Sequence, residues 1–143
     1  NDKDRYYSLN LLIKRLLLNV NFGMKKHMKS SISKKSLLLL GSPICCPSVM
    51  YNTAKIKSFS FNEKFSVNMD WDAWLRLSDI KGGFCFIRKP LLKHRIHEYS
   101  ETSRGLKDNR RLNEDEIMFR RFWPVYVSKF ITWLYSLSYR GNK

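Results

Sequence analysis

Two carboxylates, Asp70 and Asp72, stand at the start of a segment that has the features of a helix and also carries Trp71 and Trp74. A carboxylate at such a place can do acid–base chemistry, or it can cap the helix by accepting hydrogen bonds from its first N–H groups. Acidic side chains there also complement the helix dipole. Both uses are compatible with the spacing, and capping is the commoner one.

The three cysteines, Cys45, Cys46 and Cys85, are the second group of reactive side chains. They form no Cys-x-x-Cys pair and show no Cys/His spacing typical of zinc, so metal binding by thiolates is not expected. Adjacent cysteines rarely bridge without strain, and three cannot all pair within one chain. A reducing compartment is therefore favoured, and the thiols are predicted to lie in the core.

The composition predicts one globular core. The chain has 143 residues, of which 43% are hydrophobic and 14% aromatic, which argues against wholesale disorder, collagen-like repetition and a disulfide scaffold. No run reaches the roughly 18 apolar residues of a membrane-spanning helix. The opening residues 1–4 are polar and lack an initiating Met, so we expect the tail of a longer protein.

The charge is strongly positive, with 27 Lys and Arg against 12 Asp and Glu and a net charge of +15. Residues 1–40 and 104–143 contribute most of the excess, whereas residues 41–103 are nearly balanced, with nine basic and six acidic side chains. Basic flanks suit adhesion to an anionic membrane surface or to nucleic acid, and a balanced centre suits a site that uses carboxylates.

Hydrophobic spacing predicts the elements around the two carboxylates. Residues 5–20 fit an amphipathic helix, and the basic stretch 22–35 fits either a second exposed helix or a solvated connection. Residues 48–51 fit a strand, and the aromatic side chains of residues 59–65 are expected to pin a loop to the core.

A helix is predicted to begin near Asp70 and to end at Gly82-Gly83, followed by strands over residues 84–88 and 91–97. On the second strand, Arg95 and His97 share one face. Residues 98–113 are predicted to form a surface loop, and residues 114–121 a helix that Pro124 interrupts. The apolar spacing after Pro124 predicts a last helix.

Several segments, in their order along the chain, resemble the second half of a family 2 glycosyltransferase, and the resemblance covers residues 41–103. The matching segments are Gly41-Ser42-Pro43-Ile44, Pro47-Ser48-Val49-Met50-Tyr51, Phe61-Asn62-Glu63-Lys64-Phe65, Met69-Asp70-Trp71-Asp72-Ala73-Trp74-Leu75-Arg76-Leu77 and His94-Arg95-Ile96-His97. The most specific feature is the tryptophan-bearing acidic segment followed by Arg-Ile-His.

The resemblance implies an α/β fold: the C-terminal portion of a GT-A, Rossmann-like domain, with short mixed strands and flanking helices. It implies inverting transfer of a sugar from a nucleotide-diphosphate donor to a hydroxyl acceptor, in surface polysaccharide or glycolipid synthesis. Mg²⁺ or Mn²⁺ is the implied cofactor of the complete enzyme. Residues 1–40 are then a basic helical segment, residues 41–103 the acceptor-side catalytic portion, and residues 104–143 a loop and C-terminal amphipathic helices.

The resemblance also implies roles for single residues. Asp70 matches the catalytic base, although accepting helix N–H bonds would lower its pKa and weaken it as a base. The implied substrate-binding residues are Ser48, Trp71, Asp72, Trp74, Arg76 and Arg95, and the implied metal contact is His97. Both tryptophans are equally compatible with core packing. The family usually has an acid before the catalytic Asp, and Met69 stands there instead.

The donor half of the family is not recognisable. Its metal-binding D-x-D motif follows an apolar strand, and no such context precedes residue 41; Asp2-Lys3-Asp4 has the letters without the strand. We therefore expect an incomplete enzyme, and activity of this chain alone is in doubt.

Two further hypotheses concern partners. A nucleic-acid-binding module is the alternative function, motivated by the +15 charge and by aromatic side chains among Lys and Arg, but no known nucleic-acid motif appears. Residues 125–140 have a composition suited to a membrane interface, and docking on the chain's own domain is the other use of such a helix. For the sugar transfer that the resemblance implies, we expect a cytoplasmic enzyme that lies peripherally on the inner face of the membrane.

Overall fold

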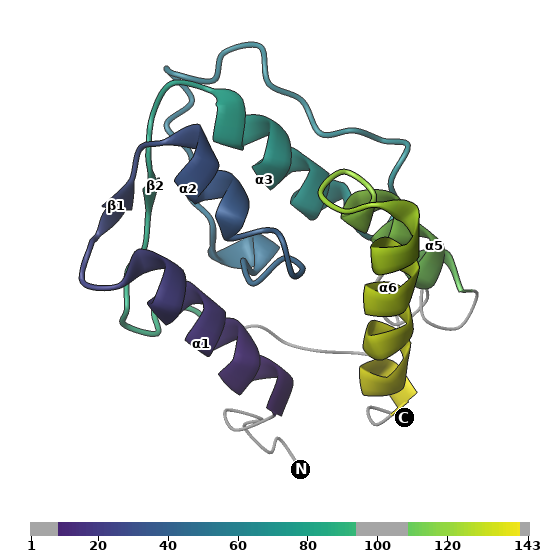
Figure 1. The fold of residues 1–143 in the computed structure, drawn as a ribbon. Helices are drawn as coiled ribbons and strands as arrows, with labels where there is room; N and C mark the ends of the chain where they lie inside the picture. The colour runs from purple at the N-terminus through teal and green to yellow at the C-terminus, as the bar shows by residue number, and fades with distance from the viewer. Residues whose placement is uncertain (1–8, 94–108, 141–143) are drawn as a thin grey trace.

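The computed structural model describes residues 9–93 and 109–140, and helices dominate this part of the chain (Figure 1). Its elements, in chain order, are α1 (Leu9–Phe22), β1 (His27–Met28), α2 (Ser31–Ser36), the 3-10 turn η1 (Cys46–Ser48), α3 (Met69–Asp79), β2 (Phe84–Cys85), α5 (Arg110–Phe119) and α6 (Val125–Arg140). The helices predicted for residues 5–20, from Asp70 and after Pro124 are confirmed within the described ranges. The predicted boundary between the loop 98–113 and the helix 114–121 is wrong, because α5 begins at Arg110 and ends at Phe119.

The strand predicted for residues 84–88 is confirmed only at Phe84–Cys85. Of the strand predicted for residues 91–97, residues 91–93 are irregular and residues 94–97 lie outside the described residues. β1 and β2 pair antiparallel, with His27 opposite Cys85 and Met28 opposite Phe84. The strand predicted for residues 48–51 is wrong, since η1 ends there and the residues after it are irregular. Pro47 explains this difference, because its fixed φ suits the start of a helical turn and it has no N–H to donate to a strand. The GT-A assignment stays a prediction, because a two-stranded ribbon is common to many architectures.

The main core lies around α3. Trp71, Ala73, Trp74 and Leu77 of this helix pack with Leu38, Phe65, Met118 and Phe119. The ring of Trp71 meets the ring of Phe119 edge to face, with centroids 5.0 Å apart. Phe65 is buried in this cluster, which confirms that a loop aromatic pins residues 59–65 to the core. Burial of two indoles and two aromatic rings makes α3 the central element of the fold.

A second apolar cluster joins α1 to the ribbon through Phe22, Met28 and Leu37. Lys34 of α2 is buried beside it, and its ammonium donates hydrogen bonds to the carbonyl oxygens of Ile80 (2.8 Å) and Gly82 (3.3 Å). The last carbonyl groups of a helix have no hydrogen-bond donor within the helix, and a cation at this end supplies one. Lys34 therefore ties α2 to the C-terminal end of α3.

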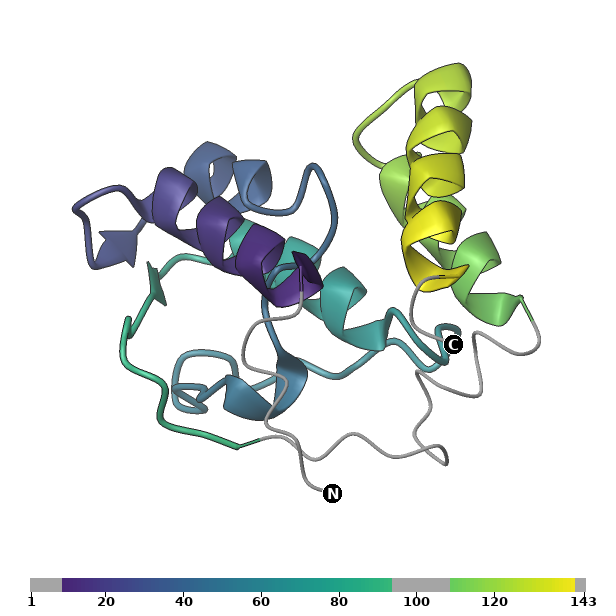
Figure 2. The same cartoon turned by 90° about the horizontal axis from the view of Figure 1, so that it is seen from below.

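Helices α5 and α6 form a hairpin that packs beside α3 (Figures 1 and 2). Pro124 lies between them, as predicted. The hydroxyl of Tyr135 donates to the Leu40 carbonyl, and the indole N–H of Trp123 donates to the Leu39 carbonyl at 2.9 Å. These two bonds attach the hairpin to the segment after α2.

The thiols are exposed, so their predicted place in the core is wrong. Cys45 and Cys46 lie in the irregular segment around η1. Cys85 alternates with Phe84 and Phe86, which face the core clusters, so the two-residue period of the strand points the thiol outward. In the parts of the chain that the structure describes, no helix combines the length and apolar character needed to cross a bilayer.

Candidate functional site

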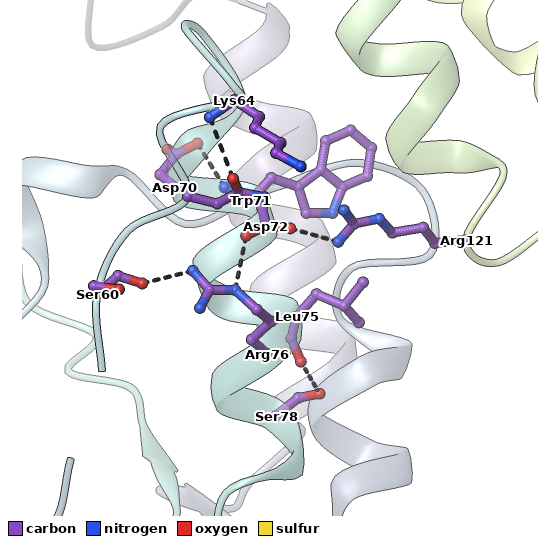
Figure 3. A network of polar contacts seen from close by, with 10 residues as sticks. Ser60, Lys64, Asp70, Trp71, Asp72, Leu75, Arg76, Ser78 and Arg121 are labelled. Atoms are coloured by element: carbon purple, nitrogen blue, oxygen red, sulfur yellow. Dashed lines mark hydrogen bonds and ion pairs between the residues drawn. The ribbon is translucent and has the colours of Figure 1, made fainter. Parts of the chain in front are cut away.

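Asp70 lies in the first turn of α3, where it accepts a hydrogen bond from the N–H of Trp71 at 2.7 Å (Figure 3). Asn68 occupies the N-cap position, but its side chain makes no capping bond. Asp70 therefore takes over part of the capping function that the sequence suggested. The carboxylate is half-buried rather than sealed in the core.

Burial raises the pKa of Asp70 above that of an ordinary Asp, although the Trp71 N–H and the charges of Arg111 and Lys14 act in the opposite direction. The capping bond was expected to lower this pKa, and desolvation outweighs it. A carboxylate with a raised pKa holds a proton more strongly, and it is a better general base once ionised.

Charged side chains from distant segments act electrostatically on Asp70. Its charge interacts with Lys14 of α1, with Arg111 of α5 and with the segment after η1. Partial burial raises the pKa of Tyr51 to about 12, and the charges of Cys46 and Asp70 add to the rise. The head of α3 thus combines one carboxylate, two cations and a protonated phenol.

Two acids of α5 hold the backbone that leads into α3. Glu114 accepts three backbone N–H bonds, from Ser66 (2.8 Å), Val67 (2.9 Å) and Asn68 (2.8 Å). Asp115 accepts from the side-chain amide of Asn68 and from the hydroxyl of Tyr139, both at 2.7 Å. Sequence reasoning missed this role, and the adjacent acids 114 and 115 at a helix were its only signal.

Asp72 is 1% exposed, and both of its carboxylate oxygens are bound within the protein. Arg76 Nε donates to Oδ2 at 2.8 Å and Arg121 Nη1 donates to Oδ1 at 2.5 Å (Figure 3). Arg76 also donates to the Ser60 carbonyl at 2.8 Å and lies over the Phe59 ring. The structure thus gives Asp72 and Arg76 a structural function, and their substrate-binding role stays a prediction. Arg121 was not foreseen.

Trp71 and Trp74 are each 2% exposed, so the packing function that the sequence left open is the one observed. Trp74 stacks on Tyr51 with ring centroids 5.8 Å apart. The indole nitrogens of both tryptophans are buried and have no hydrogen-bond partner within residues 9–93 and 109–140. Stacking of either ring on a sugar stays a prediction that would need the neighbouring side chains to move.

An open cavity of about 790 Å³ lies between α1, residues 43–56, α3 and residues 80–92. Most of its lining is apolar, and four lysines contribute to it: Lys34, Lys55, Lys81 and Lys89. Trp74 and Ser48 both line it, so the structure brings these two predicted residues together. The Ser48 hydroxyl donates to the Cys45 carbonyl at 2.7 Å. A cavity of this size suits a small-molecule ligand.

The remaining predicted residues, Arg95 and His97, lie outside the described residues. Residues 9–93 and 109–140 contain no group of three His, Cys, Asp or Glu side chains arranged to hold a metal ion. The predicted Mg²⁺ or Mn²⁺ cofactor stays a prediction, because its implied contact, His97, lies outside the described residues.

Comparison with protein-family models, with curated proteins and with solved structures finds no match to this chain.

Proposed function

We propose that the chain is the acceptor-side portion of an inverting glycosyltransferase in which Asp70 is the general base. The observation that carries this proposal is the half-buried Asp70 carboxylate, whose pKa is raised, at the head of α3. Its place in the Asp-Trp-Asp-x-Trp-Leu-Arg-Leu segment is the same as that of the base in the family that the sequence resembles.

The chemistry requires a positioned base. A sugar hydroxyl is a poor nucleophile until its proton is removed, and one positioned carboxylate contributes roughly 10²–10⁴-fold to such a step. The oxygen of the acceptor forms a bond to the anomeric carbon, the nucleotide diphosphate leaves from the opposite face, and the proton passes to Asp70. We assign the proton to Oδ2, because the Trp71 N–H already occupies a lone pair of Oδ1.

Glu114 and Asp115 are positioning residues in this proposal. Together they hold residues 66–68, which precede Asp70, by four hydrogen bonds. Fixing the reactive group in advance lowers the entropic cost of reaching the reactive geometry. Arg95 and His97 are assigned to the diphosphate side of the donor sugar nucleotide, as the resemblance implies.

The test is the Asp70→Asn substitution, made in the chain joined to its upstream coding sequence, with transfer from a nucleotide sugar as the readout. Asn caps a helix about as well as Asp, so the fold is preserved while the base is lost. We expect kcat to fall by about 10²-fold or more. Asp79→Asn, at the exposed end of the same helix, is the matched control and should keep full activity. Full activity of folded Asp70→Asn would refute the assignment.

Nucleic-acid binding is the second candidate, favoured by the +15 charge. Binding through many phosphates weakens steeply as salt rises. Failure to bind a single- or double-stranded oligonucleotide at low salt would eliminate this candidate.

A further inference from the structure

Helix α6 exposes its apolar side chains and buries small polar ones. Ser128 is fully buried and Thr132 nearly so, whereas Tyr126 is 87% exposed, Phe130 58% and Trp133 55%. The outward side chains follow the three- and four-residue spacing of one helix face, here called the outer face of α6: Tyr126, Phe130, Trp133, Leu134 and Leu137.

Specific contacts hold α6 in this orientation. The Ser128 hydroxyl donates to the carbonyl oxygens of Trp123 and Pro124, each at 3.1 Å. Ile131 and Tyr135 pack against the main core, and the hydroxyl of Tyr139 donates to Asp115. A rotation that buried the outer face would break these bonds. The exposure of the apolar face is therefore a consequence of how the hairpin is anchored.

The outer face forms a continuous aromatic surface. The rings of Phe130 and Trp133 stack on each other with centroids 5.9 Å apart, and both are more than half exposed. Contiguous apolar patches of this kind mark interaction sites, because leaving them in water is unfavourable. Tyr and Trp in particular are suited to a boundary where one part of the ring is in an apolar phase and the other in water.

The charge around the outer face identifies the partner. From residue 117 to the end of the sequence there are no acidic residues, and the basic residues are Arg120, Arg121, Lys129, Arg140 and Lys143. Lys129 lies within α6 and is exposed. Within this segment Arg121 pairs with Asp72 and Arg120 with Glu116, so Lys129 is the exposed cation of α6 in the described part of the chain. Aromatic and aliphatic groups beside a cation, in a segment without acids, complement an anionic lipid surface, in which the rings enter the headgroup region and the cation meets the phosphates.

We propose that the outer face of α6 docks in the interface of an anionic lipid bilayer. The docking is peripheral, with the helix lying along the surface. This inference depends on the exposure and charge of α6 and does not depend on the assignment of Asp70. A protein groove and a second copy of the chain are the competing occupants.

The experiment is flotation of the 143-residue chain with vesicles of phosphatidylcholine containing phosphatidylglycerol, and with vesicles of phosphatidylcholine alone. We expect binding to the anionic vesicles that weakens as salt rises. The double substitution Phe130→Ser with Trp133→Ser should lower the partition coefficient by about tenfold or more. Lys129→Glu should lower the partition coefficient less than this double substitution does. Ile32→Ser, at an exposed apolar side chain of α2, is the matched control and should bind as the unaltered chain does.

Fluorescence gives an independent readout, because Trp133 is 55% exposed and lies on the outer face, whereas Trp71 and Trp74 are buried. Trp123 is half-buried and its indole N–H is bonded to the Leu39 carbonyl. Anionic vesicles should shift the emission to shorter wavelength, and Trp133→Phe should abolish the shift. No binding at low salt, or equal binding by the Phe130/Trp133 variant that retains the unaltered far-UV circular dichroism, would overturn the proposal. Lipid-free dimerisation that the same variant abolishes would also overturn it and would assign the face to self-association.

Discussion

Asp115 of α5 accepts a hydrogen bond from the side-chain amide of Asn68 at 2.7 Å, at the residue immediately before α3. Both side chains are buried. With the three N–H bonds that Glu114 accepts from residues 66–68, this bond makes the position of the Asp70 carboxylate depend on α5. The candidate reactive group therefore sits on a backbone that a helix more than 40 residues later holds in place.

Glu114→Gln should destabilise the fold by about 2 kcal/mol, because an amide cannot accept three N–H bonds with both of its polar atoms. The measurement is the free energy of unfolding in urea. Glu116→Gln on the same helix, which loses only a surface contact with Arg120, should cost no more than about 0.5 kcal/mol. Equal effects of the two substitutions would show that Glu114 does not hold the loop.

Asp72→Asn should cost about 2–3 kcal/mol of unfolding free energy. The value lies below that of a fully buried pair because Arg76 and Arg121 are both partly exposed. Urea unfolding measures the loss, and Asp79→Asn, at an exposed carboxylate of the same helix, is the surface control that should change stability much less. A variant that kept its stability and lost only substrate affinity would instead support a binding function for Asp72.

Gly41→Ala should be more destabilising than Gly23→Ala. Both glycines have positive φ, +107° and +52°, but a Cβ at position 41 would lie 1.9 Å from the Tyr135 hydroxyl oxygen, whereas position 23 is open. We expect about 1 kcal/mol for Gly23→Ala and at least about 2 kcal/mol for Gly41→Ala. Thermal denaturation compares them, and similar costs would mean that α6 does not approach residue 41 this closely.

The sequence predicted the helix boundaries that depend on local signals. The start of α3 near Asp70 follows from Asn and Asp at a helix head, and its end before Gly82-Gly83 follows from glycine. The function of Glu114 and the Arg121–Asp72 ion pair could not be predicted, because both join residues far apart in the chain. The exposure of Cys45 and Cys46 was mispredicted because the segment around Pro43 and Pro47 has no periodicity to indicate which side faces the core. The exposure of Cys85 could have been predicted, because it alternates with Phe84 and Phe86.

The raised pKa of Asp70 also predicts a dependence of stability on pH. When burial raises the pKa of a carboxyl above its ordinary 3.8, the folded chain binds the proton more tightly than the unfolded chain. This contribution is present at low pH and is lost as the pH rises through the interval between the ordinary and the raised pKa. Asp70→Asn should therefore stabilise the chain at neutral pH and have little effect below pH 3.8. Urea unfolding of both proteins between acidic and neutral pH measures this difference in stability. Destabilisation by Asp70→Asn at neutral pH would contradict the prediction.

The central claim, that Asp70 accepts the proton of the acceptor, is tested most directly by the pH dependence of kcat/KM for sugar transfer. The measurement uses the chain joined to its upstream coding sequence. With intact Asp70, kcat/KM should fall on the acid side with an apparent pKa above the 3.8 of an ordinary Asp, because the base must be ionised. In Asp70→Asn the residual activity should lack this acid limb. An acid limb of unchanged position and depth in the folded variant would contradict the assignment.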